Sequence, residues 1–100
     1  MKLTVSSKIA TKLANKSPPV SIGEVIECFA TRDRPFLIDD RENNRTDPPT
    51  LWFISDTSMG RLLKVVFIRT DDGEIILKTA YDPNDKERWV YQTLARGTDE

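Results

Sequence analysis

Three apolar runs in the second half of the chain constrain its fold more than any other feature of the sequence. They read TLWFISD (residues 50–56), RLLKVVFIRT (61–70) and EIILKTAY (74–81), and they are rich in Val, Ile, Phe, Leu and Trp. The segments between them contain TSMG and DDG, which have the composition of tight turns. Runs of this length joined by short turns predict consecutive strands of an antiparallel sheet.

Helical spacing appears before these runs, in two segments separated by prolines. SSKIATKLANKS (6–17) opens with serines that can cap a helix, and its Ile9 and Leu13 stand four residues apart, as on one helix face. SIGEVIECFAT (21–31) follows the paired prolines of SPPV, which no helix can cross, and its Ser21 and Glu24 have the spacing of a capping box. FLI (36–38) has the length of a short strand, and a long polar loop follows it.

The closing segment DPNDKERWVYQTLAR (82–96) predicts a third helix. Asp82 is expected as its N-cap and Pro83 at its first helical position, with further acids in the first turn. The predicted fold class is therefore α+β, with two N-terminal helices, an antiparallel sheet of three to four strands that carries its helices on one face, and a C-terminal helix. We expect a single domain over residues 1–96 and a disordered tail over 97–100.

Composition excludes several kinds of chemistry. The 100 residues contain no histidine and a single cysteine, Cys28, which excludes the usual zinc sites, nucleophile triads that use imidazole, and an internal disulfide. Cys28 is expected to be a buried, inert thiol, and no metal or cofactor is expected. The net charge of −1 argues against strong nonspecific binding of nucleic acid but allows a local basic patch. The chain has neither an apolar run of membrane-spanning length nor a signal-peptide pattern, so we expect a cytoplasmic protein without membrane contact.

The hairpin around Asp71-Asp72-Gly73 decides which side chains share a face of the sheet, because side chains alternate along a strand. A two-residue turn places Lys64 opposite Tyr81 and Phe67 opposite Lys78. A three-residue loop with Gly73 in the left-handed conformation instead places Lys64 and Lys78 together on an open face. We favour the second register, because burial of a lone lysine costs several kcal/mol.

Two lysines on one open face repel each other, so this arrangement needs a reason. One reason is an anionic ligand, since Arg61 begins the same central strand and Arg45 ends the long loop. The alternative is that Lys64 and Lys78 keep the exposed face soluble. Tyr81 has a similar alternative, as a strand-end residue that closes the core and bonds to the following helix.

A second basic feature lies on the first predicted helix. Lys8, Lys12 and Lys16 recur at every fourth residue and form a stripe. The stripe is either a solvated helix face or a contact for an acidic partner or a phosphate backbone.

Several short motifs together resemble a known family. They are V-S-x-x-E-V-x-x-x-F from Val20, R-x-x-x-x-x-x-W-x-I from Arg45, G-R-x-L-K-V-V-F from Gly60, T-A-Y at 79–81 and E-R-x-x-Y from Glu87. This pattern, which extends from Lys8 to Tyr91, resembles the BrnT family of toxins from bacterial type II toxin–antitoxin pairs. These toxins belong to the RelE-like ribonucleases, within a wider group of barnase- and colicin-like folds. Sequences that resemble this chain also tend to be called ADP-ribosyl-(dinitrogen reductase) hydrolases. Enzymes of that name resemble a large all-helical domain with carboxylate-bound metal ions, which a 100-residue chain with a central sheet cannot supply, so we do not expect this activity.

The resemblance implies metal-independent cleavage of RNA, with an antitoxin protein encoded by a neighbouring gene as partner. Arg45 and Gly60-Arg61 match family positions, Thr79-Ala80 stand where the family has Ser-Ala, and Glu87 and Tyr91 match residues of the last helix. The family has an arginine where this chain has Tyr81. The other class of function that we consider is a non-catalytic module of the same fold, which binds protein or nucleic acid without cutting it.

Cleavage of RNA needs a proton acceptor, a proton donor and a cation. Because the chain has no histidine, Lys, Arg, Tyr or Glu must fill these roles. We expect Lys64 and Lys78 to bind phosphate and stabilise charge, with Arg45 and Arg61 as further phosphate clamps. Tyr81 is the expected acid–base residue. Trp52 is expected to stack on a base, and Thr79 completes the RNA-binding set.

Overall fold

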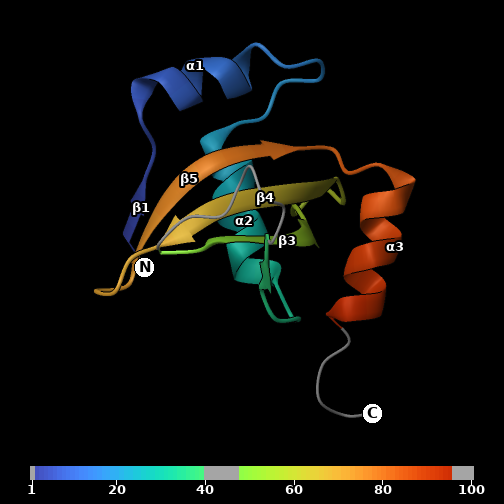
Figure 1. Cartoon of the computed structure of the whole chain (residues 1–100). Coiled ribbons are helices and arrows are strands. Elements are labelled where there is room, and N and C mark those ends of the chain that lie inside the picture. The colour runs from blue at the N-terminus through green and yellow to red at the C-terminus, as the bar shows by residue number, and fades with distance from the viewer. Residues whose placement is uncertain (1, 40–47, 96–100) are drawn as a thin grey trace.

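A five-stranded sheet forms the centre of the fold (Figure 1). The computed structural model of the chain describes residues 2–39 and 48–95. The strands lie in the order β1-β5-β4-β3-β2. Their bounds are Lys2–Thr4 for β1, Leu37–Ile38 for β2, Thr50–Asp56 for β3, Leu62–Arg69 for β4 and Glu74–Tyr81 for β5. The three predicted long strands and the short FLI strand are therefore present, and the α+β class is confirmed.

The sheet is mixed, which corrects the prediction of three to four antiparallel strands. β1 pairs with β5 in parallel, with Leu3 opposite Ile75, whereas the other three pairs are antiparallel. β1 is only three residues long, and its partner lies about seventy residues away in the sequence. A strand this short has no alternation by which local sequence could reveal it, and its pairing depends on the rest of the sheet.

Three helices accompany the sheet, and local capping determines where each one begins. α1 (Ser7–Ala14) is capped by Ser6, and α2 (Ile22–Thr31) by the predicted capping box of Ser21 with Glu24. α3 (Asp85–Leu94) begins later than expected. Its N-cap is Asn84, whose side chain accepts from the Glu87 backbone N–H while the Glu87 side chain accepts from the Asn84 N–H. With eight to ten residues each, none of the three is long enough to cross a membrane, and the described residues contain no longer helix.

The helices pack on both faces of the sheet, not on one as predicted. Phe29 of α2 lies against Phe53 and Phe67, with ring centroids 4.8 and 5.2 Å apart. Trp52 is the neighbour of Phe53 in β3 and therefore points to the opposite face, where Tyr91 of α3 contacts it. Figure 1 shows α2 behind the sheet and α3 beside the ends of its strands. The predicted burial of Cys28 is confirmed, and burial raises the pKa of its thiol to about 11.

The β4–β5 hairpin uses both of the registers considered for it, one in each part of its length. Next to the turn, Phe67 lies opposite Leu77 and Gly73 has a φ of 87°, as in the three-residue loop that we favoured. Farther along, Val66 lies opposite Thr79, so that Lys78 is an extra residue in a β-bulge. Beyond the bulge, Lys64 lies opposite Tyr81. The expectation that Lys64 and Lys78 share an open face is therefore wrong, because Lys64 is buried and Lys78 is exposed.

Two sequence predictions lie outside the described residues. Arg45 and most of the polar loop fall within residues 40–47, and the predicted tail occupies residues 97–100.

Replacement of Gly73 by alanine is expected to destabilise the domain. The φ of 87° lies in the left-handed region, and no atom beyond the neighbouring residues lies within 4 Å of an added Cβ, so the cost comes from the backbone alone. We expect a loss of about 1–2 kcal/mol in the free energy of unfolding, measured by urea denaturation. Gly23→Ala in α2 is the matched control. Its position has ordinary helical φ, and an added Cβ would meet only Ser21 Oγ at 3.8 Å, an ordinary contact, so we expect it to be neutral or stabilising by up to about 1 kcal/mol. Equal stability of the two variants would contradict the assigned turn.

Candidate functional site

Lys64 is a buried cation with a carboxylate partner. Its side chain projects from the middle of the sheet and is only 7% exposed. Its Nζ lies 2.9 Å from Oε2 of Glu87, which comes from the first turn of α3. The ammonium also lies 4.5 Å from the ring centroid of Trp52. The lysine that sequence reasoning kept on an open face can therefore be buried, because α3 brings a negative charge to it.

Tyr81 joins the same carboxylate from the neighbouring strand. Its hydroxyl donates to Oε2 of Glu87 at 2.7 Å, and Lys64 Nζ lies 5.6 Å from its ring centroid. Burial and the hydrogen bond to Glu87 raise the pKa of Tyr81 above its usual value, so the phenol is neutral at pH 7. We call these three residues the Lys64–Glu87–Tyr81 cluster.

Glu87 is ionised within this cluster. Burial by itself would raise the pKa of the carboxyl group, but hydrogen bonds from the Asn84 backbone, Lys64 and Tyr81 outweigh it and lower the pKa. At neutral pH the cluster thus contains a carboxylate, an ammonium and a neutral phenol. A proton acceptor, a cation and a proton donor meet around one oxygen atom, a combination that is suited to acid–base chemistry.

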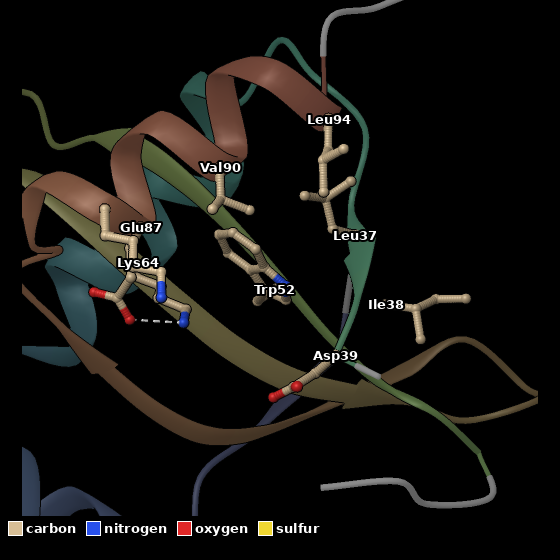
Figure 2. Close-up of a pocket in the computed structure, with 9 residues that line it drawn as sticks. Leu37, Ile38, Asp39, Trp52, Lys64, Glu87, Val90 and Leu94 are labelled. Atoms are coloured by element: carbon tan, nitrogen blue, oxygen red, sulfur yellow. Dashed lines mark hydrogen bonds and ion pairs between the residues drawn. The ribbon is translucent and has the colours of Figure 1, made fainter. Parts of the chain in front are cut away.

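A groove opens beside the cluster, between α3 and strands β2, β3 and β4. It has a volume of about 400 Å³, which is within the range of small-ligand sites. Figure 2 shows Lys64 and Glu87 at one end, Trp52 in the centre, and Leu37 with Leu94 at the other end. Its lining combines apolar walls with charged groups, and consists of Leu37, Ile38, Asp39, Trp52, Lys64, Lys86, Glu87, Val90 and Leu94.

Trp52 and Thr79 lie on the same sheet face as the cluster. Trp52 is only 8% exposed, because Lys64 covers its ring and Tyr91 packs against it at 5.5 Å between centroids. Thr79 is half-buried opposite Val66. Trp52 and Thr79 are thus near the cluster, and Trp52 lines the groove although little of it is exposed.

The structure does not bring the other predicted cations into the cluster. Lys78 is exposed on the β-bulge. Arg61 donates to both carboxylate oxygens of Glu24 at 3.1 Å and to Oδ1 of Asp82 at 2.6 Å. The same guanidinium donates to the backbone oxygen of Pro19 at 2.7 Å. Arg61 therefore connects the start of α2, the proline turn and the junction between β5 and α3, and a phosphate would have to displace these contacts.

Glu87 is the member of the cluster to which the sequence analysis gave no role. The resemblance matched this position, but the helix start was assigned to Asp82 and Pro83. An available signal was the spacing of Asn84 and Glu87, which is that of a capping box. Correct placement of that box puts Glu87 in the first turn, although its contact with Lys64 depends on how α3 packs against the sheet.

Comparison with known proteins does not assign the site. No protein-family model, no curated protein and no solved structure matches the chain.

Glu87→Gln is expected to destabilise the domain, because it leaves the Lys64 ammonium buried without a counter-charge. We expect a loss of about 2–4 kcal/mol in the free energy of unfolding, measured by urea denaturation at pH 7. Asp85→Asn is the matched control in the same helix turn. Asp85 is fully exposed and pairs only with Arg88, so its replacement should cost less than about 1 kcal/mol. Equal losses in the two variants would show that the buried pair has no special role.

Stability is also expected to fall in acid through Glu87. Because its pKa is lower in the folded protein, its stabilising effect is complete above the unfolded value of about 4.3 and is lost as pH falls through the folded pKa. Urea denaturation of the wild type and Glu87→Gln from neutral pH to about pH 3 tests this. The stability difference between them should shrink as pH falls below about 4.3. The Ser21 backbone hydrogen bond and Arg61 also lower the pKa of Glu24, but Glu24 is present in both proteins and cancels. Parallel curves would contradict the assignment.

Proposed function

We propose that the domain is a metal-independent endoribonuclease of the toxin type and that the Lys64–Glu87–Tyr81 cluster performs the chemistry. The observation that carries the proposal is the convergence of the Lys64 ammonium and the Tyr81 hydroxyl on one oxygen of Glu87, at 2.9 and 2.7 Å. Lys64 and Tyr81 were selected as catalytic candidates from the sequence, and Glu87 matched the resembled family. Their convergence from β4, β5 and α3 supports a common role.

The proposed reaction is attack of a ribose 2′-hydroxyl on the adjacent phosphorus. The Glu87 carboxylate accepts the 2′-hydroxyl proton as the new O–P bond forms. The bond from phosphorus to the 5′-oxygen breaks, and Tyr81 donates its proton to that oxygen. Lys64 stabilises the negative charge on the phosphoryl oxygens. The products are a 2′,3′-cyclic phosphate and a 5′-hydroxyl, and the proton on Glu87 returns to the Tyr81 phenolate along their hydrogen bond.

The remaining predicted residues are proposed to bind the substrate. Lys78 and Arg45 would contact phosphates, and Thr79 would donate a hydrogen bond. A base would enter the groove and contact Trp52, which lines it. Arg61 would act as a clamp only if a phosphate displaced one of its present partners, so we propose for it a supporting role in holding the β5–α3 junction.

An antitoxin protein is the proposed partner. Trp89 and Leu94 on α3 are 65% and 66% exposed, and Leu94 borders the groove. Large exposed apolar side chains of this kind support contact with another protein. A protein bound over α3 and the groove would block access to the cluster.

A non-catalytic binding module is the second candidate, and the contacts of the cations favour it. The Arg61 guanidinium is shared among Glu24, Asp82 and a backbone oxygen, and the charge of Lys64 is balanced by Glu87. Both are thus neutralised within the domain. A module of this kind would form a stable complex with RNA or protein and leave it intact.

Expression of the wild type in bacteria, in parallel with Tyr81→Phe and Lys78→Ala, tests the proposed ribonuclease activity. We expect the wild type to slow growth and shorten messenger RNA, and the purified protein to leave 2′,3′-cyclic ends. Tyr81→Phe removes the proton donor and should slow cleavage by about 10²–10⁴-fold. Lys78→Ala should slow it less, because Lys78 contributes only a phosphate contact.

Tyr91→Phe is the matched control, since it removes a phenol hydroxyl that bonds to the Pro35 backbone oxygen and not to Glu87. It should cleave at the wild-type rate. Equal growth and intact RNA in all cultures would reject the nuclease, and a stable complex with intact RNA would favour the module.

A further inference from the structure

Charge is distributed unevenly along this chain. The first 23 residues contain four lysines and neither aspartate nor glutamate, because Glu24 is the first acid. The rest of the chain contains eleven basic and sixteen acidic residues. The net charge of −1 therefore conceals a basic N-terminal segment joined to an acidic remainder.

Three of the four N-terminal lysines lie on α1 or directly after it. Lys8 and Lys12 are exposed on α1, which packs beside β5, and Lys78 is exposed on β5 itself (Figure 1). Lys16 follows the end of α1 and is half-buried. Among the described residues, no ion pair is formed by Lys8, Lys12, Lys16 or Lys78. They contrast with Arg61 and Lys64, whose charges are balanced within the domain.

Lys16 is the lysine at the α1 end that lies next to the candidate site. Its Nζ lies 5.4 Å from the ring centroid of Tyr81, and Lys64 lies 5.6 Å from the same centroid. A hollow of about 230 Å³ marks the junction and is lined by Lys16, Ser17, Pro18, Tyr81 and Asp82. The carboxylate of Asp82 in this hollow is paired with Arg61 at 2.6 Å. An anion that follows α1 therefore arrives at Tyr81.

We propose that Lys8, Lys12 and Lys16 form a track for the phosphate backbone of single-stranded RNA and lead it to Tyr81. This inference rests on the proposed function, for which it supplies the substrate path. Exposed Ser7, Thr11 and Asn15 alternate with the lysines, and hydroxyl, amide and ammonium groups are the usual partners of phosphate oxygens. The exposed residues of α1 include no Trp, Tyr or Arg, the anchors that dominate protein interfaces. The composition thus favours RNA over an acidic protein.

Fluorescence anisotropy with a short labelled single-stranded RNA tests the track. The measurement is made in the Tyr81→Phe background, so that cleavage does not remove the probe, over a series of salt concentrations. The double variant Lys8→Gln/Lys12→Gln removes two lysine–phosphate contacts. The slope of log K against log salt, which is negative, should become less steep by about 1.4. This corresponds to about 25-fold weaker binding at about 0.1 M salt.

Arg34→Gln/Arg88→Gln is the matched control. It removes the same charge from exposed residues that border a different hollow, beside α3. It should leave the slope near that of the Tyr81→Phe parent. Equal slopes for the two double variants would overturn the track, as would binding of polyglutamate through Lys8 and Lys12 without binding of RNA. If RNA binds through these lysines but the wild type does not cleave it, the track stands and the ribonuclease fails.

Discussion

The site depends on one interaction, the ion pair between Lys64 and Glu87. Lys64 projects from a central strand into a region where only 7% of its side chain is exposed, and an ammonium in such a place requires a nearby negative charge. Glu87 supplies that charge from the first turn of α3 and so joins the helix to the sheet. The position of α3 in turn forms one wall of the groove and brings a carboxylate to the hydroxyl of Tyr81. The ion pair therefore links the position of α3 to the groove and the acid–base cluster, together with the packing of Tyr91 on Trp52.

The cations of this domain fall into two groups with different physical roles. Arg61 is bound to Glu24, Asp82 and the backbone oxygen of Pro19, and Lys64 is paired with Glu87, so that both connect separate elements of the fold. Lys8, Lys12 and Lys78 are exposed, Lys16 is half-buried, and none of the four has an ion pair among the described residues. The net charge of the chain does not distinguish the two groups. Lysines of the second group can bind the phosphates of a ligand without breaking an internal ion pair, whereas Arg61 and Lys64 cannot.

Local sequence predicted the helices and strands better than it predicted how they pair and pack. The capping box of α2 and the long strands follow from short-range spacing, and they are present where expected. The start of α3 was misplaced because Asp82, a plausible cap, is bound to Arg61, whereas Asn84 caps the helix. β1 was missed because its partner is distant in sequence. For the site, Lys64, Trp52 and Tyr81 were each selected from the sequence, but the favoured register placed Lys64 beside Lys78, whereas the structure places it opposite Tyr81. The expected convergence of Lys78 and Arg61 with Lys64 was also wrong.

The sequence by itself determined where the three helices and the long strands lie, to within a few residues, because caps, turns and alternation act over short distances. It also limited the chemistry to Lys, Arg, Tyr and carboxylates, since the chain has no histidine. The tertiary structure alone decided the face on which each cation lies. A single extra residue at Lys78 changes the register halfway along the hairpin and places Lys64 opposite Tyr81. Whether Lys64 can be buried there depends on Glu87, a residue 23 positions away whose approach is set by helix packing and not by local spacing.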